Sequence, residues 1–235
     1  MGLDPVVIAA GAGTAALAAV GASYLIPAAL RFRQTQRLGR QLRHERILAL
    51  TYDDGPSPVV TSEILSLLKS YNAPATFFMI GRHAERYPAI ASKVIAEGHE
   101  VGCHSYGHLN QWKCGSSQGV KDITEGYEAL RRWVRSDGLF RPPFGKMTLS
   151  TYLAVRRRGA KVAWWTHDSG DSFDELPSPH PFCERIQRDG GGIVLMHDLD
   201  RSAPRNEFVL EITRSLLELS ARERIRLVRL SEVIT

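Results

Sequence analysis

Two short stretches carry the side chains best suited to chemistry. The stretch "LALTYDDGPSP" runs through five strand-forming residues into two adjacent carboxylates, Asp53 and Asp54. The stretch "HSYGH" places His104 and His108 four positions apart, and on a helix or compact turn both imidazoles can reach one metal ion. Two imidazoles and one carboxylate that leave a coordination position open are the catalytic pattern for Zn²⁺ or a similar divalent ion. A water molecule bound there becomes a usable nucleophile.

The adjacent aspartates suit such a site. Two neighbouring carboxylates repel each other and raise one of their pKa values unless a cation compensates. One aspartate could bind the metal ion while the other takes a proton from the bound water. Simpler explanations exist for each motif, because "DDGPSP" is rich in turn formers, Asp can cap a following helix, and an HxxxH pair can be a surface pair.

The elements that must position these residues follow from hydrophobic periodicity. Short apolar runs predict strands at 47–52, 75–80, 100–103, 139–141, 161–166, 192–197 and 226–229. A 3.6-residue period predicts helices at 61–70, 87–97, 120–135 and 208–219. This alternation predicts an α/β fold with parallel strands, either a small irregular barrel or an open doubly wound sheet.

Both architectures place active sites at the C-terminal ends of the strands. Chemically capable side chains cluster at those ends in this sequence. In chain order the set is Asp53, Asp54, His104, His108, Arg141, Asp168, Asp171, His197 and Asp198.

Five short motifs contain all of these residues except Asp198. "TYDDG", "HSYGH", "RPPFG", "DSGD" and "LMH" occur in the order and approximate spacing of the NodB-homology polysaccharide deacetylases, carbohydrate esterase family 4. The resemblance covers residues 47–235 and implies a distorted (β/α) barrel of about seven parallel strands. It also implies removal of N-acetyl groups from the amino sugars of a glycan of the chitooligosaccharide or peptidoglycan type. One divalent metal ion, usually Zn²⁺ with Co²⁺, Ni²⁺ or Mn²⁺ as alternatives, is implied as well.

The resemblance also implies roles for the residues at the metal site. Asp53 looks like the general base of the family. Asp54, His104 and His108 look like its metal ligands. Arg141 would hold the base carboxylate through a charge-assisted hydrogen bond.

Further roles concern the substrate and the leaving group. His197 looks like the general acid that protonates the leaving amine, with Asp168 orienting it and raising its pKa. The backbone N–H of Phe144 would help to stabilise the oxyanion, and Leu195 would line the pocket for the acetyl methyl group. Pro143 is expected to contact the substrate beside Phe144.

Two departures from the family pattern affect the expected glycan preference. Phe144 stands where the third motif more often has Tyr, so a hydroxyl contact to sugar is lost while a backbone role survives. Ser172 follows Asp171 where the family often has Trp, so one wall of the sugar site is weakened. A non-catalytic saccharide-binding barrel is an alternative, but the intact catalytic set argues against it.

The N-terminal region differs from the rest of the chain. Residues 5–30 contain no charged side chain, and this length can span a bilayer. We therefore expect residues 1–30 to be a hydrophobic helix that serves as a membrane anchor or signal-like segment, with lipid contact through 5–30. Residues 31–46 would be a basic juxtamembrane linker, which favours the cytoplasmic face, and 47–235 the catalytic domain. The anchor motivates an alternative function, an N-deacylase or deformylase acting on a lipid-linked amino sugar.

Net charge and cysteine content bear on three further possibilities: a nucleic-acid partner, disulfides and a cysteine zinc site. The net charge is +5, and the six arginines and one glutamate within residues 31–46 account for the surplus. The remainder is close to neutral, so no nucleic-acid partner is expected. Three cysteines without a CxxC pair indicate neither a disulfide framework nor a cysteine zinc site. The sequence defines no oligomeric state.

Overall fold

The computed structural model describes residues 5–234, and of residues 5–19 the backbone alone. The strands are β1 (Ile47–Asp53), β2 (Thr76–Met79), β3 (Glu100–Cys103), β4 (His167–Asp168), β5 (Gly192–His197) and β6 (Arg226–Leu227). The helices are α1 (Pro5–Glu45), α2 (Val60–Ser70), α3 (Gly81–Arg86), α4 (Pro88–Ala96), α5 (Ser116–Ala129), α6 (Leu149–Arg157), α7 (Pro179–Asp189) and α8 (Ala203–Glu223). Two single turns of 3₁₀ helix, η1 (Pro143–Gly145) and η2 (Leu230–Glu232), complete the fold.

The strands form one parallel sheet in the order β3-β2-β1-β5-β4, and β6 pairs with the start of β1. The prediction of an α/β fold with parallel strands is therefore confirmed. The register sets Asp53 at the end of β1 beside Phe78 of β2 and His197 of β5. Residues far apart in the sequence thus meet at the C-terminal edge of the sheet, where active sites of parallel sheets lie.

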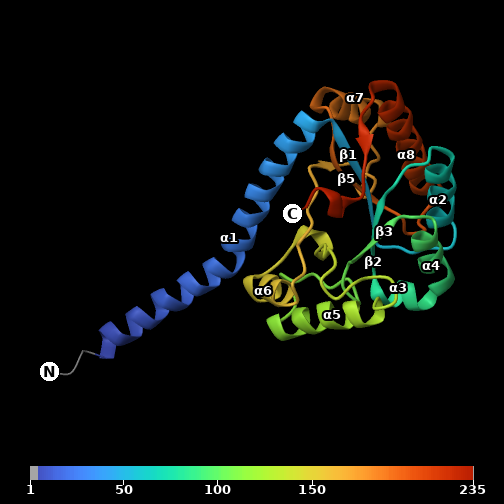
Figure 1. The fold of residues 1–235 in the computed structure, drawn as a ribbon. Coiled ribbons are helices and arrows are strands. Elements are labelled where there is room, and N and C mark those ends of the chain that lie inside the picture. The colour runs from blue at the N-terminus through green and yellow to red at the C-terminus, as the bar shows by residue number, and fades with distance from the viewer. Residues whose placement is uncertain (1–4, 235) are drawn as a thin grey trace.

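The side chains of β1 alternate between two apolar clusters on opposite faces of the sheet. Leu48, Leu50 and Tyr52 belong to the larger apolar cluster, together with residues of α2 and α8. Figure 1 shows α2, α4 and α8 on one side of the strands and α1 on the other. Ile47 and Ala49 belong to a second cluster, which includes residues of α1. Because strand side chains alternate in direction, Asp53 lies on the same face as this second cluster.

The sheet has six strands rather than the expected seven or so. The expected strand at 139–141 is reduced to single bridges of Phe140 with Cys103 and with Val162. Prolines at 142 and 143 carry no N–H and cannot extend the ladder. The expected strand at 161–166 changes partner within its length, because the Ala163 N–H donates to Phe140 and the Thr166 N–H to Ile193.

The prediction of a membrane anchor was wrong. Within the described part of the chain, no helix is long and apolar enough to cross a membrane. Residues 5–30 do lie in a helix, but Ala and Gly dominate this stretch, so its hydrophobicity is modest, and α1 continues through the arginine-rich residues to Glu45. The predicted membrane-anchored localisation is therefore wrong as well. The lipid contact through 5–30 and the lipid-linked substrate were expected only because of this anchor, so they have no support.

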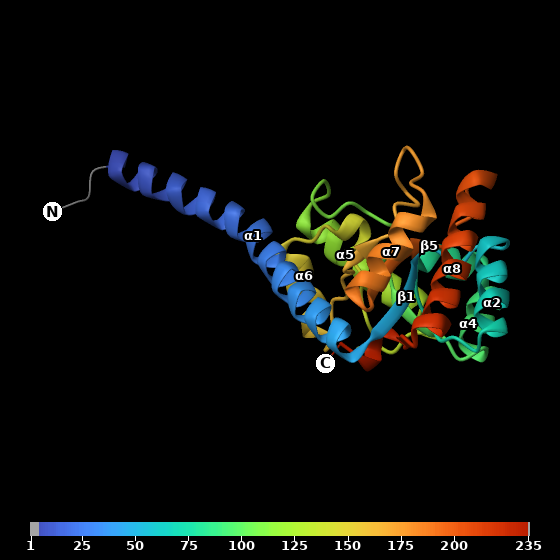
Figure 2. The ribbon, with the colours of Figure 1, turned by 90° about the horizontal axis from the view of Figure 1, so that it is seen from above.

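The expected linker at 31–46 is instead the packed half of α1. Figures 1 and 2 show α1 lying along the domain with its C-terminal half and projecting away with its N-terminal half. Leu38 and Leu42 are buried in the second apolar cluster. The Arg43 guanidinium forms an ion pair with Asp189 at 2.9 Å, and the Gln34 amide donates to the carbonyl of Val162 at 3.1 Å. This half of α1 is thus an integral part of the domain.

Replacing Leu42 by Ala tests this packing. Leu42→Ala removes apolar contacts from a fully buried position, so we expect the free energy of unfolding to fall by about 2–5 kcal/mol. Urea denaturation measures the change. Leu25→Ala is the matched control, because Leu25 lies on the same helix with 69% of its surface exposed and should change stability by less than about 0.5 kcal/mol. Equal effects of the two changes would contradict the packed position of α1.

Candidate active site

A buried ion pair holds the side chain of Asp53. Arg141 Nη1 donates hydrogen bonds at 2.8 Å to Asp53 Oδ1 and at 2.8 Å to Thr51 Oγ1. The guanidinium is fully buried, with its carbon 4.1 Å from the ring centroid of Phe78. Burial lowers the pKa of Arg141, and the Asp53 carboxylate opposes that shift. The second oxygen, Asp53 Oδ2, faces the imidazole of His104, 3.8 Å from its Nε2.

Asp54 turns into the same space and meets both histidines. Its φ of 76° lies in the left-handed region, which breaks the alternation of the strand and redirects the side chain. Asp54 Oδ1 lies 3.4 Å from His104 Nε2 and 3.2 Å from His108 Nε2. This oxygen is buried and has no hydrogen-bond partner within the described residues. One carboxylate oxygen and two imidazole nitrogens, all within 4.8 Å of one another, therefore form a candidate metal site.

Contacts behind the imidazoles set their direction. His104 Nδ1 donates to the backbone carbonyl of Arg141 at 2.7 Å, which leaves Nε2 pointing toward Asp54. The ring of His108 packs against the ring of Phe144 with centroids 4.6 Å apart. Metal-binding histidines in proteins are commonly oriented by a hydrogen bond from their second ring nitrogen, as His104 is here.

The "HSYGH" loop is held by Asp122 of α5, a residue that sequence reasoning did not identify. Its carboxylate accepts hydrogen bonds from the backbone N–H groups of Gly107 at 2.6 Å and Leu109 at 3.3 Å. Its carbonyl accepts from the N–H of Tyr106 at 3.0 Å. The helix approaches so closely that a Cβ at Gly126 would lie 2.5 Å from the loop backbone. The helical period around Asp122 showed only that it lies on a helix, not which loop it would contact.

The charges suit a cation. Burial opposes ionisation of Asp54, but the imidazoles of His104, His197 and His108 hold its pKa below the usual range. Burial lowers the pKa of His108 to about 4, so its nitrogen lone pair is free at neutral pH. An ionised carboxylate and a neutral imidazole are the protonation states that metal binding requires. Burial alone would lower the pKa of His104, but Asp53 and Asp54 raise it. A cation bound at Nε2 would take the place of that proton between the carboxylates. The donor set therefore fits a divalent metal ion.

Asp171 orients the third histidine of the site. His197 Nδ1 lies 2.8 Å from Asp171 Oδ1, and the His197 backbone N–H donates to Asp171 Oδ2 at 2.9 Å. Arg201 donates to the same Oδ2 at 2.8 Å. Burial alone would lower the pKa of His197, but Asp171, with help from Asp54 and Asp53, raises it to about 9. His197 thus retains its proton over most of the physiological range.

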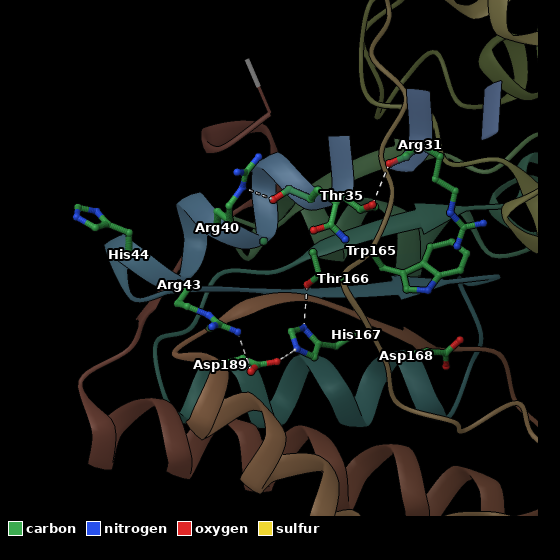
Figure 3. A pocket seen from close by; sticks show the side chains of 13 residues that line it. Arg31, Thr35, Arg40, Arg43, His44, Trp165, Thr166, His167, Asp168 and Asp189 are labelled. Carbon is green, nitrogen blue, oxygen red and sulfur yellow. Dashed lines mark hydrogen bonds and ion pairs between the residues drawn. The ribbon is translucent and has the colours of Figure 1, made fainter. Parts of the chain in front are cut away.

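The expected partner of His197, Asp168, lies elsewhere. Asp168 Oδ1 accepts the N–H of Gly170 at 2.9 Å, and its side chain lines a groove beside α1 (Figure 3). Gly170 has a φ of 79°, and this turn brings Asp171 back over the end of β5. "DSGD" offers two aspartates at one strand end, and only the turn between them decides which one meets His197.

The expected substrate contacts lie at the edge of the site. Pro143 is buried, whereas Phe144 is 55% exposed beside His108. Leu195 is buried in β5, next to Thr51 in the ladder. Their contact with substrate stays a prediction.

The turn after β1 is stabilised without using the aspartate pair. Asp200 Oδ1 accepts the N–H of Val60 at 2.8 Å and so satisfies the N-terminus of α2. Asp198 Oδ1 accepts the N–H of Gly55 at 3.0 Å, and burial raises the pKa of Asp198 to about 7. Capping of α2 thus falls to Asp200 from a distant segment and to Ser57 of the turn. Asp53 and Asp54 remain available for chemistry.

Comparison with known proteins agrees with this arrangement. The family model described as polysaccharide deacetylase matches residues 40–163, slightly more than half of the chain. This chain belongs to the polysaccharide deacetylase family. The predicted family is therefore confirmed, as is the prediction that the chain is an enzyme of this class.

Individual relatives cover most of this polysaccharide deacetylase. A peptidoglycan-N-acetylglucosamine deacetylase of Bacillus cereus is 32% identical over 193 residues, 81% of this chain and 89% of the relative. A chitooligosaccharide deacetylase of Azorhizobium caulinodans is 30% identical over 166 residues, 68% and 77% of the two chains. The solved structure of the peptidoglycan deacetylase PdaC from Bacillus subtilis superposes with a TM-score of 0.69 at 27% identity, covering 81% of this chain and 91% of that chain.

Removing the Asp122 carboxylate should weaken metal binding. Asp122→Ala leaves two N–H groups of the "HSYGH" loop without acceptors, so we expect the zinc affinity to fall about 10- to 100-fold. Competition with a chromophoric chelator measures the affinity, and circular dichroism checks the fold. Glu125→Ala, an exposed change on the same helix, should leave the affinity unaltered. Unchanged zinc affinity in a folded Asp122→Ala variant would refute the positioning role.

The His197–Asp171 pair predicts a pH dependence. The family resemblance implies that His197 is the general acid, and an acid must be protonated to act, so kcat/KM is expected to fall as pH rises through the His197 pKa of about 9. Asp171→Asn removes the charge that raises this pKa, so the alkaline limb should move to lower pH by about 1 unit or more. The pH profile of acetate release measures the limb. Asp168→Asn is the control, and a shift in that variant instead of Asp171→Asn would show that the pairing seen here is wrong.

Proposed function

We propose that this chain is a metal-dependent hydrolase that removes N-acetyl groups from amino sugars of a peptidoglycan- or chitooligosaccharide-type glycan. The observation that carries the proposal is the Asp54 oxygen that lies between His104 and His108 without a hydrogen-bond partner among the described residues. Asp53 faces His104, and His197 is the neighbour of Asp53 in the ladder. The activities named for the relatives support this substrate class.

A single divalent ion, Zn²⁺ by preference and Co²⁺, Ni²⁺ or Mn²⁺ as alternatives, would be held by Asp54, His104 and His108. When bound, it would polarise the acetyl carbonyl and lower the pKa of a coordinated water.

Asp53 would be the general base. Arg141 engages one of its oxygens, which fixes the orientation of the carboxylate and leaves the other facing His104 and the open side of the site. That free oxygen would accept a proton from the attacking water as the water adds to the acetyl carbon. Holding the base in one orientation contributes to the rate because the reacting groups need no further ordering.

His197 would be the general acid. Its Nδ1 is engaged by Asp171, so the proton for the leaving amine would come from Nε2. The C–N bond then breaks, the amine takes that proton, and acetate is released with the oxygen of the water. Proton uptake by Asp53 and proton release by His197 balance the reaction.

The turn Pro143–Gly145 and β5 would shape the acetyl pocket. The Phe144 N–H would stabilise the oxyanion, and Leu195 and Pro143 would contact the substrate.

The single bridges of Phe140 join β3 to the segment that leads into β4, and we infer that the sheet closes in this way as a distorted barrel. Phe144 stands where the family more often has Tyr, and Ser172 where it often has Trp. We expect these two differences to set the glycan preference.

Acetate release tests this function. The full chain loaded with Zn²⁺ should release acetate from N-acetylated chitooligosaccharides or peptidoglycan fragments. Asp53→Asn and His104→Ala should reduce the rate about 10²-fold or more, because one removes the base and the other a metal ligand. His180→Ala is the matched control, since His180 is exposed and remote from the metal ligands. A folded, zinc-loaded chain without release from either substrate would argue against the deacetylase, and a chain that binds no divalent ion would overturn the mechanism.

A further inference from the structure

A residue of the N-terminal helix reaches the catalytic turn. Arg31 of α1 donates from Nη1 to the backbone carbonyl of Gly145 at 3.0 Å, across 114 positions of sequence. Gly145 ends the turn Pro143–Gly145, and the ring of Phe144 in this turn packs on the metal-site histidine His108 at 4.6 Å. Arg31 therefore links α1 to the wall of the metal site through a hydrogen bond.

The guanidinium of Arg31 occupies a closely fitted place. Its carbon lies 4.6 Å from the ring centroid of Trp165 and 5.2 Å from that of Trp164, and Figure 3 shows it against the Trp165 indole. A Cβ on Gly145 would lie 2.6 Å from Cη2 of Trp165 and 2.8 Å from Nη1 of Arg31. The turn, the indole and the guanidinium are thus in direct contact, so a shift of one must move the others.

The turn needs support from outside. Phe144 has a φ of 57° and Gly145 a φ of 61°, so two successive residues lie in the left-handed region, one of them not glycine. Such backbone persists only where its surroundings hold it. Within the turn, the Gly145 and Lys146 N–H groups donate to the prolines before them, and the Phe144 N–H takes no part in these two bonds. Arg31 supplies the contact from the side of α1.

The contact is not required to attach α1 to the domain. Leu38 and Leu42 are buried in the apolar cluster, and Arg43 pairs with Asp189. These anchors lie one turn or more beyond Arg31, toward the end of the helix. The Arg31 contact therefore acts on the turn more than on the attachment of α1.

We propose that Arg31 is a positioning residue for the deacetylation reaction. Through the carbonyl of Gly145 it sets the orientation of the Phe144 N–H and ring, which makes α1 a working part of the active site. The inference rests on the proposed function, in which the Phe144 N–H meets the developing oxyanion. It assigns to the basic half of α1 a role in catalysis.

Removing the guanidinium should impair turnover without affecting the fold. In the zinc-loaded full chain, Arg31→Ala should lower kcat about 10- to 100-fold while KM, zinc affinity and the urea midpoint stay close to those of the parent. Arg31→Lys should recover part of the loss, because an ammonium can donate to the carbonyl but cannot lie flat on the indole. Arg33→Ala, an exposed change on the same helix, should leave kcat unaltered.

Added guanidinium ion gives a second readout. At about 10–50 mM, far below unfolding concentrations, it should restore kcat in Arg31→Ala, because the vacated place between Gly145 and Trp165 fits it. Ammonium at equal ionic strength should restore much less, because it can donate to the carbonyl but cannot lie flat on the indole. An unchanged kcat in Arg31→Ala, or a loss that tracks the urea midpoint and resists guanidinium, would overturn the proposal.

A spectroscopic measurement separates this inference from the activity itself. If the parent releases no acetate, the proposed function fails on its own, and the position of the turn can still be followed. The amide resonance of Phe144 and the ring resonances of His108 should shift in Arg31→Ala, return toward the parent with guanidinium, and stay in place in Arg33→Ala. Unmoved resonances in Arg31→Ala would show that Arg31 does not position the turn.

Discussion

The buried pair of Arg141 and Asp53 is the constraint on which the rest of the site depends. The guanidinium is fully buried, and within the described residues its Nε and Nη2 have no hydrogen-bond partner. One carboxylate, one hydroxyl and the face of Phe78 must compensate for its desolvation, so loss of the carboxylate would leave an unpaired charge in the interior. The backbone carbonyl of Arg141 also holds His104. Arg141 thereby fixes the positions of both Asp53 and His104.

Several residues around this pair have strained backbone. Asp54, Ser105, His108 and Phe144 all have positive φ values although none is glycine. Asp54 and His108 direct their side chains toward each other, Ser105 accepts the N–H of His108, and the Phe144 ring packs on His108. Such conformations cost free energy, and neighbouring elements hold them. Asp122 of α5 supports the histidine loop, and α1 contacts the turn that carries Phe144.

The arginine-rich residues 31–46 make contacts within the domain. Arg31 contacts the turn Pro143–Gly145, Arg43 pairs with Asp189, and Arg46 donates to the carbonyl of Glu223 at 2.6 Å. A run of arginines after an apolar stretch was read as a juxtamembrane pattern because composition alone does not show which side chains fold back on the domain. The surplus charge that it contributes is partly engaged in contacts between α1 and the rest of the fold.

The sequence alone predicted those features that depend only on residues close together in the chain. The expected strands at 100–103 and 192–197 match β3 and β5, and the expected strand at 47–52 is one residue shorter than β1. These strands are buried almost throughout, and a continuous run of adjacent apolar residues marks such a strand in the sequence. The motifs located Asp54, His104 and His108, which the structure brings together. Only the tertiary structure decided that Asp171 rather than Asp168 meets His197, that 139–141 forms single bridges, and that residues 31–45 pack as helix. Each of these depends on contacts between segments distant in the chain, and no local pattern records such contacts.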